Sequence, residues 1–330
     1  MKKTKRIFKI IVFNLIFLLV ILLCIDYLIY TKYKNDYLKT IEHQDLFPPI
    51  SYIENYKAEQ YVTTSLFEYS KKYPLIGYFR PISGKEYKNK KSAIIFGCSF
   101  AHGFGLKDEQ TISEKLAQKT KRTVFNFGID GAGIQHMLKL IKHNNLYETI
   151  NIPPENIIYI YIPEHIDRLR ANLRPHPMMT NGRNLKYKIK NNALVIDNSM
   201  LDLFSKTFIV KSILYQLDFK RDNKSTKNKE YNKNLTIRIF IESKKLLQEK
   251  YPDIKFTILK YEIEDDEFED IEPKEMWKEL EKEGFIIIKS SNLIGRKYKY
   301  NSKDTNEDLF HPSEAAWDLL IPPLVEKLNL

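Results

Sequence analysis

The chain of 330 residues is 43% hydrophobic and 13% aromatic, which is enough to bury at least one sizeable core. Its formal net charge is +11, but residues 1–40 contain eight Lys or Arg and two Asp, so six of these charges lie there and five in the remainder. The basic residues at 218–233 alternate with polar ones, and no nucleic-acid-binding motif accompanies them, which argues against a nucleic-acid-binding protein. The only two cysteines are Cys24 and Cys98, so no disulfide framework is expected.

The N-terminus predicts a membrane anchor. Residues 7–30 form an apolar stretch of bilayer-spanning length that only Lys9, Asn14 and Asp26 interrupt. No small-residue cleavage site follows this stretch, so we expect a retained transmembrane helix rather than a cleaved signal peptide. The basic residues before it indicate that residues 1–6 are cytoplasmic. The chain is therefore predicted to be a single-pass membrane protein with its bulk on the extracytoplasmic side.

Residues 31–90, with many Pro, Tyr and Lys, are expected to form a stalk and lead-in, and residues 91–330 a single domain. In this domain, short apolar runs alternate with segments of helical period, which is typical of βαβ units and a parallel sheet. The predicted strands cover residues 92–96, 123–127, 156–162, 255–260 and 285–289, and the predicted helices cover 111–120, 133–144, 235–250 and 312–328. Five strands with helices between them indicate a flavodoxin-like three-layer α/β/α sandwich, which binds ligands at the carboxyl ends of its strands.

An insertion at about 174–233 interrupts this alternation. It contains a predicted hairpin, residues 186–189 and 193–196 around Asn191-Asn192, followed by a short apolar helix near 203–217. The basic residues at 218–233 are expected to form a solvated loop. The regular pattern then resumes with the helix at 235–250.

Residues near opposite ends of the domain indicate a chemical function. Ser99 stands where the first predicted strand ends, in Gly97-Cys98-Ser99-Phe100, and a doubly wound sheet presents side chains to substrate at such a place. A serine hydroxyl is a weak nucleophile unless a base takes its proton, and that base needs an orienting carboxylate. Asp308-Leu309-Phe310-His311 supplies both groups three residues apart. The residues therefore predict a triad of Ser99, His311 and Asp308.

A third motif, Asn126-Phe127-Gly128-Ile129-Asp130-Gly131, lies between these two. The three occur in the order and approximate spacing of blocks I, II and V of the SGNH (GDSL-type) hydrolases, and residues 92–325 resemble that family. The resemblance implies the SGNH hydrolase fold and a two-step acyl transfer through an acyl-enzyme. It also implies an oxyanion hole made by the amides of Ser99 and Gly131 and by an asparagine side chain in block III.

The chain departs from the family pattern in two places. Cys98 replaces the Asp of Gly-Asp-Ser, which is not the nucleophile. Where block III has Gly-x-Asn-Asp, this chain has Ile162-Pro163-Glu164-His165. His165 is the predicted replacement donor, and Glu164 could donate only if protonated. Loss of one oxyanion donor typically lowers the rate by about 10²- to 10³-fold. For His165 and Arg168, surface positions and contacts with an anion or substrate both stay open.

No cofactor or metal is expected. Gly128-x-x-Gly131-x-Gly133 is not the Gly-x-Gly-x-x-Gly of a dinucleotide loop, and the histidines show no metal-ligand spacing. The predicted function is a serine-dependent carbohydrate O-acetyl esterase that acts on an acylated glycan or another small ester outside the cytoplasm. Two alternatives are an SGNH-type O-acyltransferase that modifies an envelope glycan and a catalytically weakened SGNH protein that binds glycans or assembles partners.

Overall fold

The structure is a computed structural model of the chain. The residues that it describes are 9–10, 12–14, 16–25, 80, 83–87, 91–129, 131–142, 146–147, 150, 152–169, 187–196, 226–264, 273–299, 302–306 and 310–330.

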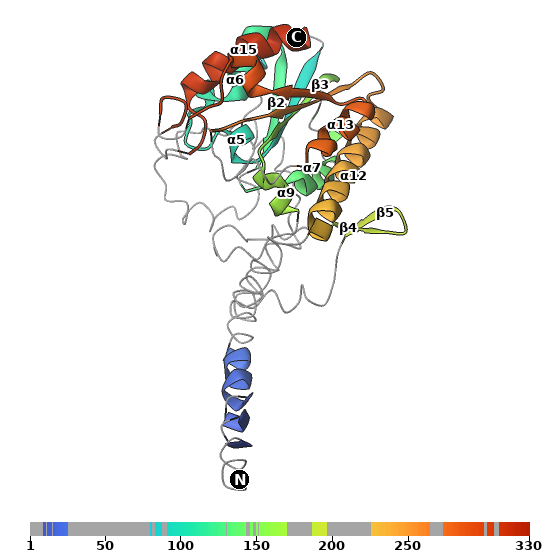
Figure 1. Ribbon diagram of the computed structural model, residues 1–330. Coiled ribbons are helices and arrows are strands. Elements are labelled where there is room, and N and C mark those ends of the chain that lie inside the picture. Colours follow the sequence, from blue (N-terminus) through green and yellow to red (C-terminus); the bar gives the residue numbers. More distant parts are fainter. Residues whose placement is uncertain are drawn as a thin grey trace.

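A five-stranded parallel sheet forms the centre of the domain (Figure 1). Its strands are β1 (Ser92–Gly97), β2 (Thr123–Gly128), β3 (Pro154–Tyr161), β6 (Lys255–Lys260) and β7 (Ile286–Lys289). Their order is β2-β1-β3-β6-β7, which is the flavodoxin-like order, so the predicted sheet is confirmed. Every residue of β1 and β2 is buried, because both faces of a parallel sheet are covered, and this explains their continuous apolar runs.

Helices cover the two faces of this sheet. They are α5 (Ser99–His102), the 3₁₀ helix η1 (Asp108–Gln110), α6 (Ile112–Thr120), α7 (Ile134–Ile141), α9 (Glu164–Arg168), α12 (Thr226–Lys250), α13 (Lys274–Lys282), α14 (Ser290–Ile294) and α15 (Glu314–Leu328). Residues of α5, α6 and α15 bury one hydrophobic cluster, and residues of α7, α9, α12 and α13 bury another. Figure 1 shows α6 and α15 on one side of the strands and α12 and α13 on the other, as expected for three layers.

The predicted hairpin is confirmed. Strands β4 (Tyr187–Lys190) and β5 (Ala193–Ile196) pair antiparallel, with Tyr187 opposite Ile196. Asn191 and Asn192 join them with φ angles of 49° and 64°. Positive φ at both central positions suits the right-handed twist of a two-residue hairpin, and Asn tolerates this conformation better than most residues. The helix predicted near 203–217 lies outside the described residues.

Helix α12 begins earlier than predicted, so the prediction of a solvated loop is wrong for residues 226–233. The helix spans Thr226–Lys250, and no Gly or Pro interrupts it. The Lys233 Nζ lies 2.9 Å from a carboxylate oxygen of Glu230 and 3.5 Å from one of Glu279 in α13. The polar composition of this segment predicts a loop because it carries no apolar face. The contact with α13, which supports the additional turns, is a tertiary feature.

Part of the predicted lead-in contacts the sheet. Ser83 forms an antiparallel bridge with Val124 of the edge strand β2, through Ser83 N to Val124 O at 3.1 Å and Val124 N to Ser83 O at 2.9 Å. The side chain of Arg80 is also buried. Residues 80 and 83–87 therefore belong structurally with the domain that follows them.

The predicted membrane span, residues 7–30, falls partly outside the described residues. Residues 9–10, 12–14 and 16–25 are helical, and their large apolar side chains, such as Phe13 and Phe17, are exposed. Among the residues that the structure describes, no helix is both long enough and apolar enough to cross a membrane.

Candidate active site

A sharp turn at the end of β1 presents Ser99. Gly97 has a φ of 151°, and a Cβ atom built on it would lie 2.8 Å from the Cβ of Ala101 and 2.9 Å from the carbonyl oxygen of Ile160. Glycine adopts this φ angle without strain, and it has no Cβ atom to clash with these neighbours. The turn leads directly into α5, whose first residue is Ser99. The nucleophile predicted from sequence therefore lies at the carboxyl edge of the sheet, where ligands bind in this topology.

The structure brings His311 to Ser99. The His311 Nε2 lies 2.8 Å from the Ser99 Oγ, although the two residues are 212 positions apart. When Nε2 carries no proton, the Ser99 hydroxyl donates to it, which is the arrangement of a nucleophile and its general base. Asp308, the predicted orienting carboxylate, lies outside the described residues, so its role stays a prediction.

Three aromatic rings surround the His311 imidazole. The ring centroid of His311 lies 4.9 Å from that of Phe104, 5.2 Å from that of Phe310 and 5.3 Å from that of Phe100. Phe100 is fully buried, whereas Phe310 is 37% exposed. The rings limit the orientations of the imidazole and make its surroundings apolar. Ser99 itself is only 8% exposed.

The loop that carries His311 is closed at its base. The amide of Asn306 donates to the His311 carbonyl at 2.8 Å, and the amide of Ser313 donates to the Asp304 carbonyl at 3.0 Å. Ser313 also begins α15, because its side chain accepts from the amide of Ala316 as an N-cap. These bonds fix the backbone on both sides of His311.

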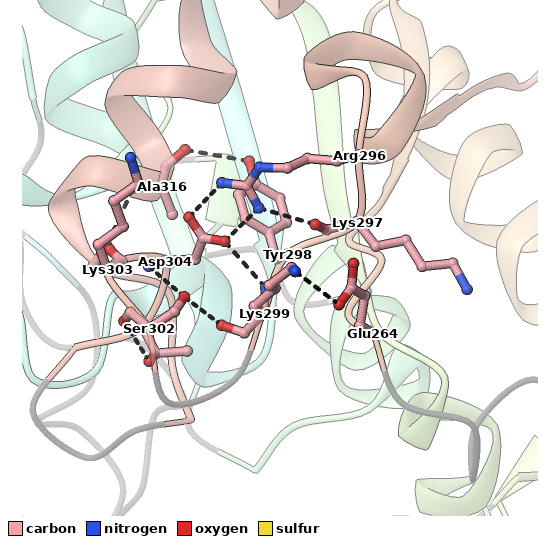
Figure 2. Close-up of polar contacts among 11 residues, drawn as sticks. Glu264, Arg296, Lys297, Tyr298, Lys299, Ser302, Lys303, Asp304 and Ala316 are labelled. Atoms are coloured by element: carbon pink, nitrogen blue, oxygen red, sulfur yellow. Dashed lines mark hydrogen bonds and ion pairs between the residues drawn. The ribbon is translucent and has the colours of Figure 1, made fainter.

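An ion pair between the buried Asp304 and the partly exposed Arg296 anchors this loop to the preceding segment (Figure 2). Arg296 donates to both oxygens of the Asp304 carboxylate, at 2.5 and 2.7 Å, and the amide of Lys299 donates to the same carboxylate at 3.1 Å. The side chain of Asp304 is 4% exposed. The hydrogen bonds from Arg296, followed by that from Lys299, hold the pKa of Asp304 below its ordinary value of 3.8.

Replacing Asp304 with asparagine should lower the free energy of unfolding at pH 7 by about 1.5–3 kcal/mol, because hydrogen bonds to a charged group contribute about that much. The folded-state pKa of Asp304 is depressed, so its contribution is present above the ordinary value and disappears as the pH falls through the folded-state pKa. Urea denaturation of both proteins should show the difference shrinking between pH 7 and pH 3. A matched control is Asp318→Asn, which removes the pair between the exposed Asp318 and Lys115 and should cost under about 1 kcal/mol, because Lys115 keeps its pair with Glu314. An equal cost at both pH values would contradict the assignment.

A buried arginine, Arg80, supports the residues that follow Ser99. Arg80 is 3% exposed, and its guanidinium donates to the carbonyl oxygens of His102 at 2.8 Å, Gly103 at 2.5 Å and Leu106 at 2.8 Å. It also pairs with Asp108 at 2.8 Å. Arg80 lies in the predicted lead-in, and no motif there distinguishes it from other basic residues. Sequence reasoning missed it for this reason.

The side chain of Asn126 connects α5, the helix that begins with Ser99, to the end of β2. The Asn126 side chain donates to the Ala101 carbonyl at 2.8 Å and accepts from the Gly128 amide at 2.9 Å. Gly128 leaves no room for a side chain, because a Cβ atom there would lie 2.4 Å from the amide nitrogen of His102. The end of β2 is therefore held directly against α5.

The predicted oxyanion donor Gly131 lies in a turn that follows β2. The amide of Ala132 donates to the carbonyl of Ile129 at 2.9 Å, and Gly131, the third residue of this turn, has a φ of 69°. The hydrogen bond that closes a β-turn does not use the amide of its third residue, so the Gly131 amide can donate elsewhere. The turn starts beside the nucleophile, since the Ile129 amide donates to the Gly97 carbonyl at 3.1 Å.

His165 lies in the core. It is fully buried, its Nδ1 lies 2.9 Å from the Tyr159 hydroxyl, and its ring contacts those of Tyr159 and Tyr161 edge-on. Burial, and then the charges of Arg168 and His136, hold its pKa well below the ordinary value, so the ring is neutral. Among the described residues, its Nε2 has no hydrogen-bond partner. None of these contacts joins His165 to Ser99 or His311, and its role as an oxyanion donor stays a prediction.

The described residues contain no group of three or more His, Cys, Asp or Glu side chains that could hold a metal ion. Fold and site together define a class of protein: a flavodoxin-like α/β protein with a hydrogen-bonded Ser-His pair at the carboxyl edge of its sheet.

Comparisons with solved structures give matches at low sequence identity. No family model and no curated protein matches the chain. Among solved structures, it is similar to a member of the lipolytic protein G-D-S-L family from Veillonella parvula DSM 2008, with 13% identity, coverage of 72% of this chain and 98% of that one, and a TM-score of 0.39. It is also similar to TesA, with 12% identity, coverage of 72% and 98%, and a TM-score of 0.42. A third is the acetyl xylan esterase Est2A from the rumen bacterium Butyrivibrio proteoclasticus, with 8% identity, coverage of 72% and 63%, and a TM-score of 0.40.

Proposed function

We propose that this chain is an SGNH-type serine hydrolase that cleaves acyl esters, of the carbohydrate O-acetyl esterase type. The observation that carries the proposal is the 2.8 Å contact between the Ser99 Oγ and the His311 Nε2 at the carboxyl edge of a flavodoxin-like sheet. The three sequence motifs that resemble SGNH blocks I, II and V support it, because they supply the nucleophile, the oxyanion turn and the base.

In the proposed reaction, the Ser99 Oγ attacks the ester carbonyl while its proton passes to the His311 Nε2. The amides of Ser99 and Gly131 stabilise the oxyanion of the tetrahedral intermediate. His311 then protonates the leaving alkoxide, which leaves an acyl group on Ser99. Water, deprotonated by His311, hydrolyses this acyl-enzyme. Asp308 is the proposed residue that orients His311.

An O-acyltransferase is the second candidate, and the aromatic surroundings of His311 favour it. Phe104 and Phe310 make the approach to the base apolar, and an apolar site that limits access of water favours transfer of the acyl group to a bound hydroxyl. A catalytically weakened SGNH protein that binds glycans is the third candidate. The lack of a block III asparagine supports that alternative.

Purified protein should release acetate from a small acetyl ester and should react with a fluorophosphonate probe. Turnover of an acetylated glycan donor, measured with and without a glycan acceptor, separates the esterase from the O-acyltransferase. Turnover that depends on the acceptor, with negligible hydrolysis, would reject the esterase in favour of the transferase. A folded protein that neither reacts with the probe nor turns over esters would favour the binding role.

We also propose that residues 7–30 anchor the protein in a membrane and that the domain acts on the extracytoplasmic side. The apolar composition of this stretch and the basic residues before it support this location. The exposed apolar side chains at Phe13, Ile16 and Phe17 are consistent with a lipid environment. Expressed protein should resist extraction from membranes at alkaline pH, and deletion of residues 1–30 should release it.

A further inference from the structure

The peptide group between Ala132 and Gly133, which follows Gly131, is hydrogen-bonded at both its carbonyl and its amide. The Arg168 Nη1 donates to the Ala132 carbonyl at 2.9 Å. At the other end of the same peptide, the Gly133 amide donates to the His136 Nδ1 at 3.0 Å. Both bonds lie within two residues of Gly131, the proposed oxyanion donor. The orientation of the turn therefore depends on side chains from α9 and α7.

This peptide lies in a tightly packed part of the domain. Ala132 and Gly133 are both buried, and a Cβ atom at Gly133 would lie 2.5 Å from the Gln135 side chain and 3.0 Å from the Cβ of Arg168. A buried backbone carbonyl or amide without a hydrogen bond is costly, so the bonds from Arg168 and to His136 stabilise the peptide in this one orientation.

Arg168 is itself well anchored for this task. Its own carbonyl accepts from the Gln135 side chain at 2.6 Å, which ties the end of α9 to the start of α7. Within the part of the chain that the structure describes, its guanidinium forms no ion pair with a carboxylate. A hydrogen bond from a charged donor is stronger than one from a neutral donor. The Ala132 carbonyl therefore accepts its hydrogen bond from a charged donor.

We propose that Arg168 is a positioning residue that holds the Gly131 turn in the geometry for oxyanion binding. Arg168 follows β3 in the segment where the block III asparagine is expected and not found. It acts through the Ala132 carbonyl and has no proposed contact with substrate. This inference rests on the proposed function, since the turn needs fixed geometry only if it stabilises an oxyanion. A displacement of about 1 Å at such a site can lower the rate by about 10²-fold.

The test compares Arg168→Met with Arg168→Lys and a matched control, Arg122→Met. Arg122 pairs with Glu155 and precedes β2 at the opposite end of the sheet, so kcat of that control should be unchanged. Methionine cannot donate, and kcat for hydrolysis of a small acetyl ester should fall about 10- to 100-fold with KM within about twofold. Lysine, which keeps a charged donor, should retain more activity than methionine. Hydrogen exchange of a peptide covering residues 129–136 should accelerate in Arg168→Met and stay unchanged in Arg122→Met.

Two results would overturn the proposal. One is unchanged exchange of residues 129–136 in Arg168→Met, because the turn would then be held without the guanidinium. The other is faster exchange with unchanged kcat, because the turn would then have no role in the reaction. A wild-type protein without probe labelling or ester turnover would instead contradict the proposed function, and the exchange measurement would still decide whether Arg168 holds the turn.

Discussion

Replacing Ser99 with alanine is expected to abolish labelling by a fluorophosphonate and to lower ester turnover by about 10⁴- to 10⁶-fold, as loss of the nucleophile does in serine hydrolases. The variant lacks the Oγ that lies 2.8 Å from the His311 Nε2, so no acyl-enzyme can form. The side chain is small and lies at the start of α5, so the fold should persist. Gel fluorescence of the probe and a single-turnover acetate assay measure the two effects.

Ser92→Ala is a matched control for this experiment, because Ser92 lies at the opposite end of the same strand. Its hydroxyl donates to the carbonyl of Ile152 at 2.8 Å, and its removal should cost about 1 kcal/mol of stability with full labelling. Labelling that persists in Ser99→Ala would contradict the assignment of the nucleophile.

Replacing Gly97 with alanine should destabilise the domain by more than about 3 kcal/mol, because the change combines backbone strain with overpacking. The new methyl group would lie 2.8 Å from the Cβ of Ala101 and 2.9 Å from the carbonyl oxygen of Ile160, and the φ of 151° is one that L residues rarely adopt. Relief of this clash would move the start of α5 and with it Ser99. The free energy of unfolding, measured by urea denaturation, and the rate of ester turnover should therefore both decrease.

Gly295→Ala separates the two causes. Gly295 has a φ of 75°, but a Cβ atom there would meet no atom within 4 Å, so only the backbone strain of about 1–2 kcal/mol remains. A Gly97→Ala protein that is as stable as Gly295→Ala and as active as wild type would show that the turn at the end of β1 can relax. The position of Ser99 would then not depend on a glycine at residue 97.

Local patterns predicted the layered architecture well. Buried strands of a parallel sheet must be apolar on both faces, so β1, β3 and β6 are recognisable in the sequence as apolar runs. Their alternation with helices implies a parallel sheet. The hairpin could also be predicted from the sequence, because Asn191 and Asn192 favour the positive φ angles that a two-residue turn needs. Polar segments were less predictable, as the early start of α12 shows. Its first turns depend on pairs such as Lys233 with Glu279, which local composition does not reveal.

In the candidate site too, some residues could be predicted from the sequence and others were found only in the structure. The position of Ser99 at the end of a strand indicates a nucleophile, and Asp308-x-x-His311 indicates its base and an orienting carboxylate. The oxyanion role of Gly131 is implied by the resemblance to SGNH block II. Only the tertiary structure placed Ser99 and His311 2.8 Å apart and buried His165 against Tyr159. It also revealed the supports at Arg80, Arg168 and the Arg296-Asp304 pair. These residues act on backbone carbonyls or carboxylates that are distant in the chain or follow no motif, so their roles depend on how the chain is packed and leave no periodic trace in the sequence.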